Sequence, residues 1–116
     1  MSILDKVRKE LKGGLDFMEG KEKGNINDLN KYESVNIIDF GFLIDRDSKE
    51  EYACFVVYEE GKYFYFGGSV VTEKLRRIQE ALTSEELTEL LMEGLPVKFV
   101  NKKSEKGRKY IDMVVQ

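Results

Sequence analysis

The sequence contains no histidine and a single cysteine, and both facts narrow the chemistry open to the chain. Histidine is the commonest general base and metal ligand, so its absence removes Ser-His and Cys-His pairs and the usual zinc sites. Cys54 cannot form an internal disulfide, and its place in the apolar run YACFVVY predicts a buried side chain. Carboxylate or magnesium chemistry stays an alternative, but no DxD motif or phosphate-binding loop supports it. We therefore expect a non-enzymatic protein without a metal or cofactor.

Long apolar runs are also absent. No stretch approaches the ~18 residues that cross a membrane. The N-terminal run SILDKVRKELKGG has charged residues where a signal peptide needs an apolar segment. The 116 residues are 41% hydrophobic and 35% charged, which is typical of one soluble domain. The composition thus predicts a cytoplasmic protein without membrane contact.

Residues 1–32 are predicted to lie outside the main domain. Residues 2–12 have the apolar spacing of a short amphipathic helix, which a glycine pair would end. Residues 13–31 are rich in Gly, Asn and charge, which favours a linker or mobile loop. Three apolar side chains interrupt this linker: Leu15, Phe17 and Met18. They would dock either on the main domain or on another subunit, and self-association through the N-terminal helix is one expectation.

From residue 33 the apolar spacing changes from helical to alternating, which predicts a β domain over residues 33–116. Residues 33–45 form a long predicted strand, in which Gly41 would allow a bend or bulge. One face of that strand collects Ile38, Phe40, Phe42 and Ile44. Residues 51–66 follow as a β-hairpin with a tight turn in the middle.

A helical crossover then connects the hairpin to the last two strands. Spacings of four, three and four residues give one helical stripe: Val71, Leu75, Ile78 and Leu82. Thr83 and Glu86 have the spacing of a capping box, which opens a second short helix that ends at Gly94. Residues 96–100 and 110–115 are the fourth and fifth predicted strands.

Three strands, a helical crossover and two strands are the order of the oligonucleotide-binding fold (OB-fold), a five-stranded Greek-key barrel. The predicted fold class is therefore mainly β, or α+β, with an OB-like barrel and a short N-terminal helix. Other α+β meanders share this element order and remain the alternative. In an OB-fold, ligands lie across strands two and three, beside the loop that joins strands four and five.

The loop between the last two strands is the most strongly charged stretch. From residue 98 to residue 109 there are six basic residues against the single acid Glu105, in a chain of net charge -3. The basic residues are Lys98, Lys102, Lys103, Lys106, Arg108 and Lys109. Exposed charges act over about 8 to 10 Å, so a basic hairpin can neutralise backbone phosphates even on an acidic protein. The alternative is a solvated hairpin tip without a partner.

Tyrosines on the predicted hairpin supply a second candidate feature. The alternation in GKYFYFGG puts Tyr63 and Tyr65 on one face and Phe64 and Phe66 on the other. We expect the tyrosines outside, because their hydroxyls favour water, and the phenylalanines inside. Such a surface stacks bases at about 1 to 3 kcal/mol each. Packing of all four rings in the core or at its rim is the alternative.

The register of this hairpin decides which side chains join the tyrosines. A two-residue turn would pair Tyr58 with Tyr63 and add Tyr52 to the same face. A three-residue turn with a glycine bulge would instead place Phe55 opposite Tyr65. Glutamate disfavours the positive φ of the tighter turn, so both registers stay open.

Two runs carry a resemblance: FVVYEEGKYFYFGGSVVTEKL and VKFVNKKSEKGRKYIDMVV. They resemble small proteins of phages and mobile elements of low-GC Gram-positive bacteria. The closing strand, basic turn and strand are similar to phage-type single-stranded DNA-binding proteins with an OB-fold. This resemblance covers residues 33–116. Bacterial single-strand binders commonly end in an acidic tail that recruits partners, whereas this chain ends at YIDMVVQ, so recruitment through such a tail is not expected.

Together these features predict binding of single-stranded DNA, with RNA as a variant, by tyrosine stacking and phosphate neutralisation. The residues expected to carry it are Tyr58, Lys62, Tyr63, Tyr65, Lys102, Lys103, Lys106, Arg108, Lys109 and Tyr110. The alternative is a protein-interaction or assembly module of a phage or mobile element. In that case the same face and the N-terminal helix dock on a partner or a second copy, and the tyrosines serve as interface anchors.

Overall fold

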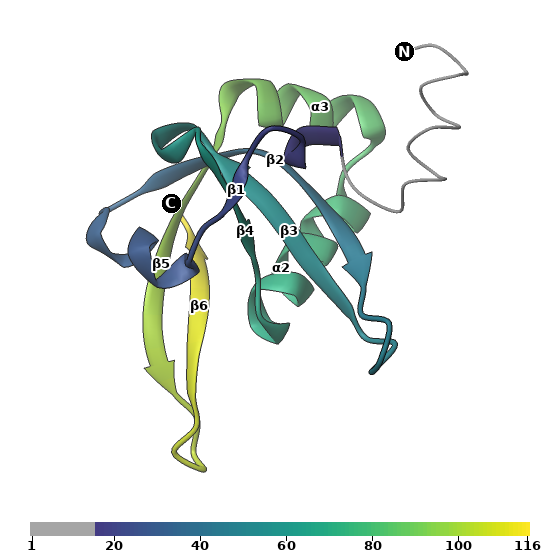
Figure 1. Cartoon of the computed structure of the whole chain (residues 1–116). Helices are drawn as coiled ribbons and strands as arrows, with labels where there is room; N and C mark the ends of the chain where they lie inside the picture. The colour runs from purple at the N-terminus through teal and green to yellow at the C-terminus, as the bar shows by residue number, and fades with distance from the viewer. Residues whose placement is uncertain (1–15) are drawn as a thin grey trace.

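The computed structural model describes residues 16–116, and a six-stranded sheet with the order β1-β4-β3-β2-β5-β6 lies at its centre (Figure 1). The strands are β1 (Glu22–Lys23), β2 (Val35–Ile44), β3 (Glu51–Val57), β4 (Tyr63–Phe66), β5 (Leu95–Lys103) and β6 (Lys109–Val115). The helices are η1 (Asp16–Met18), η2 (Ile26–Lys31), η3 (Tyr58–Glu60), α2 (Ser69–Ala81) and α3 (Ser84–Glu93), where η marks a 3-10 helix. The fold is mixed α+β, and among the pairings of the described strands only β1–β4 is parallel.

The sheet curls around its core. Phe55 on β3 stacks on Tyr65 of the neighbouring β4, with 5.7 Å between ring centroids. Phe55 also stacks on Phe99 of β5 at 5.3 Å, although β2 lies between β3 and β5 in the sheet. A flat sheet could not bring these two rings together, because strands two places apart are about 10 Å from each other. Side chains of η2 and α2 fill the inner face: Leu29, Val71 and Leu75.

The curled sheet does not close into a barrel, so the OB-fold expectation is not confirmed. Closure would require β4 to pair with β6, and the described strands contain no such pair. The free edge of β4 is taken by β1 instead. The N–H of Glu22 donates to the carbonyl of Lys62 at 3.0 Å, and the N–H of Gly24 donates to that of Phe64 at 2.8 Å.

Residues 16–31 belong to this fold, so the expectation of a linker is wrong for them. Besides the strand β1, they supply η2, whose Leu29 is 1% exposed in the core. Asn25 caps η2 by accepting a hydrogen bond from the N–H of Asn27 at 3.0 Å. Phe17 and Met18 are half-buried. Leu15 and the predicted helix over residues 2–12 lie outside the described residues.

The long strand β2 forms as predicted, but its bulge lies at a different residue. The register shifts between Ile37 and Asp39, and Gly41 sits in a regular part of the ladder opposite Cys54. Ile38 is therefore the extra residue and is 38% exposed rather than inward. The extra residue reverses the alternation, so that odd-numbered residues face the core before the bulge and even-numbered residues face it afterwards. Because of it, Val35 and Ile37 face the core before the shift and Phe40 after it.

The crossover helices agree with the sequence prediction. Val71 and Leu75 are buried on α2, and Ile78 packs against the core. The capping box is present: the N–H of Glu86 donates to Thr83 Oγ1 at 3.1 Å, and the N–H of Thr83 donates to Glu86 Oε1 at 3.0 Å. Among the helices of residues 16–116, none has the length and apolar character needed to cross a membrane.

Candidate nucleic-acid interface

The β5–β6 hairpin carries the basic residues on a regular ladder. Both strands are longer than predicted, so only residues 104–108 connect them. The connection is held by the N–H of Gly107, which donates to the carbonyl of Ser104 at 2.9 Å with φ 82 at the glycine. Lys103 lies opposite Lys109 in the register, and Lys102 lies opposite Tyr110. The ladder therefore fixes the backbone positions from which these cations extend.

The hairpin forms one wall of a groove of about 740 Å³. Its side of the groove consists of Asn101, Lys102, Lys103, Lys109, Tyr110 and Ile111. The other wall is made of η2 and the start of α2: Ile26, Asn27, Gly68, Ser69 and Val70. Gly68 gives α2 no side-chain cap, so the first N–H groups of this helix have no acceptor within it. The groove is thus lined by side-chain cations and by the positive end of a helix dipole.

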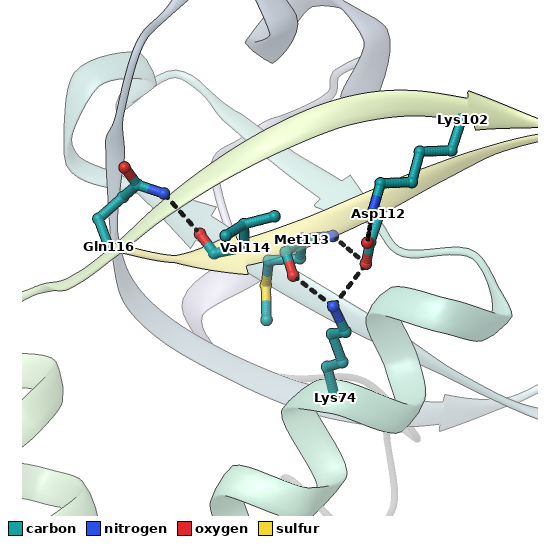
Figure 2. Close-up of polar contacts among 6 residues, drawn as sticks. All are labelled: Lys74, Lys102, Asp112, Met113, Val114 and Gln116. Atoms are coloured by element: carbon teal, nitrogen blue, oxygen red, sulfur yellow. Dashed lines mark hydrogen bonds and ion pairs between the residues drawn. The ribbon is translucent and has the colours of Figure 1, made fainter.

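Lys102 forms an ion pair with Asp112, a residue that the sequence interpretation missed (Figure 2). Lys102 Nζ donates to Asp112 Oδ2 at 2.6 Å, and Lys74 Nζ of α2 donates to Asp112 Oδ1 at 2.6 Å and to the carbonyl of Met113 at 2.9 Å. Asp112 is only 6% exposed. The hydrogen bonds from Lys102 and Lys74 lower the pKa of its carboxyl to about 2, against the effect of burial. The same carboxylate raises the pKa of Lys102.

The expectation that Tyr63 and Tyr65 face outward while Phe64 and Phe66 face inward is wrong. Tyr65 is 2% exposed in the core, and burial raises its pKa to about 12. Tyr63 is half-buried and packs against the same core. The two phenylalanines are half-buried on the opposite face of β4. The cause is the register: Phe55, a core residue of β3, lies opposite Tyr65.

This pairing is the one predicted for the three-residue turn, but the turn itself differs. Residues 58–60 form η3, and Gly61 follows with φ -64, so it makes no glycine bulge with positive φ. The two acids of η3 are used inside the fold. Glu59 Oε1 accepts from the N–H of Asn36 at 2.7 Å, and Glu60 Oε1 accepts from the Tyr32 hydroxyl at 2.6 Å.

The predicted site residues therefore divide into separate groups. Lys102, Lys103, Lys109 and Tyr110 meet in the groove, and Lys106 and Arg108 are exposed at the hairpin tip. Tyr58, which is 75% exposed, belongs to η3, and Lys62 directly precedes β4, whereas the groove contacts the chain just after the end of β4, at Gly68. Strand β4 thus separates the two groups.

Residues 16–116 also bear on two further kinds of site, a reactive thiol and a metal site. Cys54 is fully buried, and desolvation raises the pKa of its thiol to about 12, which disfavours the reactive thiolate. Over residues 16–116, no group of three or more Cys, Asp or Glu side chains could hold a metal ion.

Comparisons with known proteins return nothing: no family model, no curated protein and no solved structure matches the chain. The resemblance to phage-type single-strand binders stays a prediction. The geometry of the groove is therefore the basis for any functional conclusion.

Proposed function

We propose that the protein binds single-stranded nucleic acid, with DNA as the expected partner, in the groove beside the β5–β6 hairpin. The observation that carries this proposal is the pairing of Lys103 with Lys109 on adjacent strands. Like charges directly opposite each other destabilise a sheet. Of the described residues, no carboxylate forms an ion pair with either lysine, so the fold itself does not offset this cost. A phosphate held between the two ammonium groups would offset it.

The surroundings of the lysine pair favour an extended polyanion over a single small anion. Lys106 and Arg108 continue the positive surface to the hairpin tip, and both are exposed. Tyr110 also lines the groove, and it offers a ring to a base on the face of β6 opposite to Lys109. Phosphate neutralisation by several cations and contact of bases with aromatic rings are the two elements of general single-strand binding.

A relation of this fold to the OB-fold is part of the same proposal. The strand order β4-β3-β2-β5-β6 has a helical crossover between β4 and β5. Pairing of β4 with β6 would turn it into a five-stranded barrel. The structure is open at that place, and the groove is lined by β6 on one side and by the residues after β4 on the other.

Fluorescence anisotropy with labelled oligo-dT at low salt tests the proposed function. We expect wild-type protein to bind, and the double variant K103E/K109E to bind at least tenfold more weakly. The matched control is R46E/K49E in the β2–β3 turn, which reverses two exposed charges outside the groove and should change affinity less than threefold.

Two results would contradict the proposal. One is an absence of binding at low salt. The other is an equal loss in both double variants, which would show that only the overall charge matters. Light scattering that reports growth of the particle with concentration, together with no oligonucleotide binding, would favour the assembly alternative. Oligo-rU in place of oligo-dT measures the preference between RNA and DNA.

A further inference from the structure

Three aromatic rings form a row on the outer face of β3 and β4, away from the core. The rings of Tyr52 and Phe66 meet edge to face with centroids 5.2 Å apart, and Phe64 lies 5.4 Å from Phe66. All three side chains are half-buried. A contiguous cluster of partly exposed aromatic rings is typical of a surface that contacts a ligand or partner. The core does not account for it, since the core rings lie on the other face.

Phe66 is the ring of this row that connects to the basic groove. It lines a pocket of about 490 Å³ together with Lys23 and Ile26, and Ile26 also lines the groove. Phe66 further lines a second pocket, of about 430 Å³, that shares Gly68 and Ser69 with the groove. Phe64 lines none of these three hollows. A chain molecule seated in the groove can therefore reach Phe66 without crossing a ridge of the core.

Charge selects one of the two routes from the groove to Phe66. The second pocket is lined by the acids Asp45, Glu50 and Glu51, of which only Glu51 has a cation partner among residues 16–116, Arg76. These carboxylates would repel a phosphate backbone. The described residues that line the first pocket include Lys23 and no acid. A nucleic acid is thus directed along Ile26 and Lys23.

Lys23 is close enough to Phe66 to contact a nucleic acid that is bound on this ring. Strand β1 positions its Nζ 5.1 Å from the centroid of the Phe66 ring. An exposed contact between a cation and a ring is weaker than the stacking of a base on the same ring. A base can therefore displace the ammonium group from the ring face, and the ammonium then stays close to the phosphate of that base.

We infer that the groove and Phe66 form one continuous site for a single strand, with phosphates on the hairpin and an unpaired base on the Phe66 ring. This inference rests on the proposed function and specifies the partner more closely. A base inside a duplex is paired and stacked on its neighbours, so it cannot lie on a protein ring unless it leaves the helix. The site therefore selects single strands over duplexes.

The test compares F66L with F64L, which removes the same ring two positions away on the same face of the strand. We expect F66L to bind oligo-dT about tenfold more weakly than wild type, F64L to bind within twofold, and F66Y to bind as wild type. Inorganic polyphosphate has the charge of the backbone but no bases. It should bind wild type, F66L and F64L equally. Thermal unfolding followed by circular dichroism shows which variants are folded.

A measurement on wild-type protein avoids any effect of mutation. Oligo-dT in which 5-iodo-deoxyuridine replaces thymine is cross-linked by ultraviolet light, and the modified residue is found by mass spectrometry. Attachment at Phe66 supports the inference, and attachment at Tyr58 or Tyr63 overturns it. Equal affinities of wild type and F66L for oligo-dT also overturn it while the proposed function stands. If wild-type protein binds polyphosphate but not oligo-dT, both fail.

Discussion

Asp112 connects the basic hairpin to the rest of the fold through a single side chain. Its carboxylate accepts hydrogen bonds from Lys102 on the hairpin and from Lys74 on α2 (Figure 2). The charge of Lys102 is thereby used within the protein, although its sequence position suggests a phosphate contact. A buried carboxylate with two ammonium partners is stable only when it is ionised. The ionised carboxylate therefore adds a link between the hairpin and α2 to the contacts that the β2–β5 ladder and the core already make.

Replacement of Asp112 by Asn should remove a pH-dependent part of the stability. The folded pKa of Asp112, about 2, is below the ordinary value of 3.8, so the ionised form stabilises the fold above about pH 4. That contribution is lost as the pH falls from about 4 to about 2. Because both lysines are partly exposed, we expect about 1 to 2 kcal/mol in the free energy of unfolding at pH 7. Urea unfolding of wild type and D112N at pH 7 and pH 2.5 measures it.

The matched control is D47N, which removes an exposed acid in the β2–β3 turn. D112N should be less stable than wild type at pH 7 and nearly equal to it at pH 2.5, whereas D47N should follow wild type at both. A difference between D112N and wild type that stays the same at both values would show that the carboxylate acts through packing and not through its charge.

The tyrosines of β4 show why single residues were hard to place from the sequence. Alternation alone correctly separates Tyr63 and Tyr65 from Phe64 and Phe66, since they lie on opposite faces. It does not say which face is the core, because Tyr and Phe differ by one hydroxyl and both bury large apolar rings. The choice is made by Phe55 on the neighbouring strand, which brings Tyr65 into the core stack. Cys54 was predicted as buried, and this is confirmed.

At the scale of elements, the features that depend on neighbours in the sequence were predicted well. The capping box at Thr83 and the end of α3 at Gly94 are local signals, and both are confirmed. Strand β1 was missed, because two residues show no periodicity and its parallel partner lies about 40 residues further along the chain. Composition suggested a linker there. Yet Gly24 is a contact residue: a Cβ at this position would lie 2.5 Å from Tyr65 Cε1.

Replacement of Gly24 by Ala should therefore loosen β1 from the sheet. The added methyl overlaps the Tyr65 ring and meets Tyr63 Cβ at 3.0 Å, so either the ring or the strand must move. Overpacking of this kind costs about 1 to 3 kcal/mol in the free energy of unfolding. Hydrogen exchange should become faster at the N–H of Gly24, which bonds to Phe64. Urea unfolding and exchange measured by NMR test both effects.

Gly61→Ala is the control for G24A. Gly61 has φ -64 and open space where its Cβ would lie, so alanine fits without strain. We expect G61A to keep the stability of wild type or to gain about 0.4 to 1 kcal/mol from the lower entropy of the unfolded chain. Equal stabilities of G24A and G61A would contradict the close packing of β1 on β4.

At the scale of the whole molecule, charge is segregated in a way that the sequence already indicated. Exposed acids lie on the crossover helices: Glu80, Glu85, Glu86, Glu89 and Glu93. The exposed cations of the hairpin lie on β5, β6 and their connection. The sequence did not predict that the sheet stays open, since closure depends on whether β4 meets β6 or β1. The two possible partners of β4 are distant from it in the chain, so no short sequence pattern indicates which of them pairs with it.

The number of hairpin cations available to phosphates sets how strongly salt can weaken nucleic-acid binding. Four cations at the groove and at the tip of the hairpin have no carboxylate partner among the described residues: Lys103, Lys106, Arg108 and Lys109. Because Lys103 and Lys109 share one phosphate, these four cations contact about three phosphates. At about -0.7 for each phosphate contact on a single strand, the hairpin contributes about -2 to the slope of log K against log salt. K106Q should make the slope shallower by about 0.7. K98Q removes an exposed cation of β5 that does not line the groove and should leave it unchanged. Anisotropy titrations of oligo-dT at four salt concentrations measure these slopes. Equal slopes for K106Q and K98Q would mean that the bound strand does not follow the hairpin.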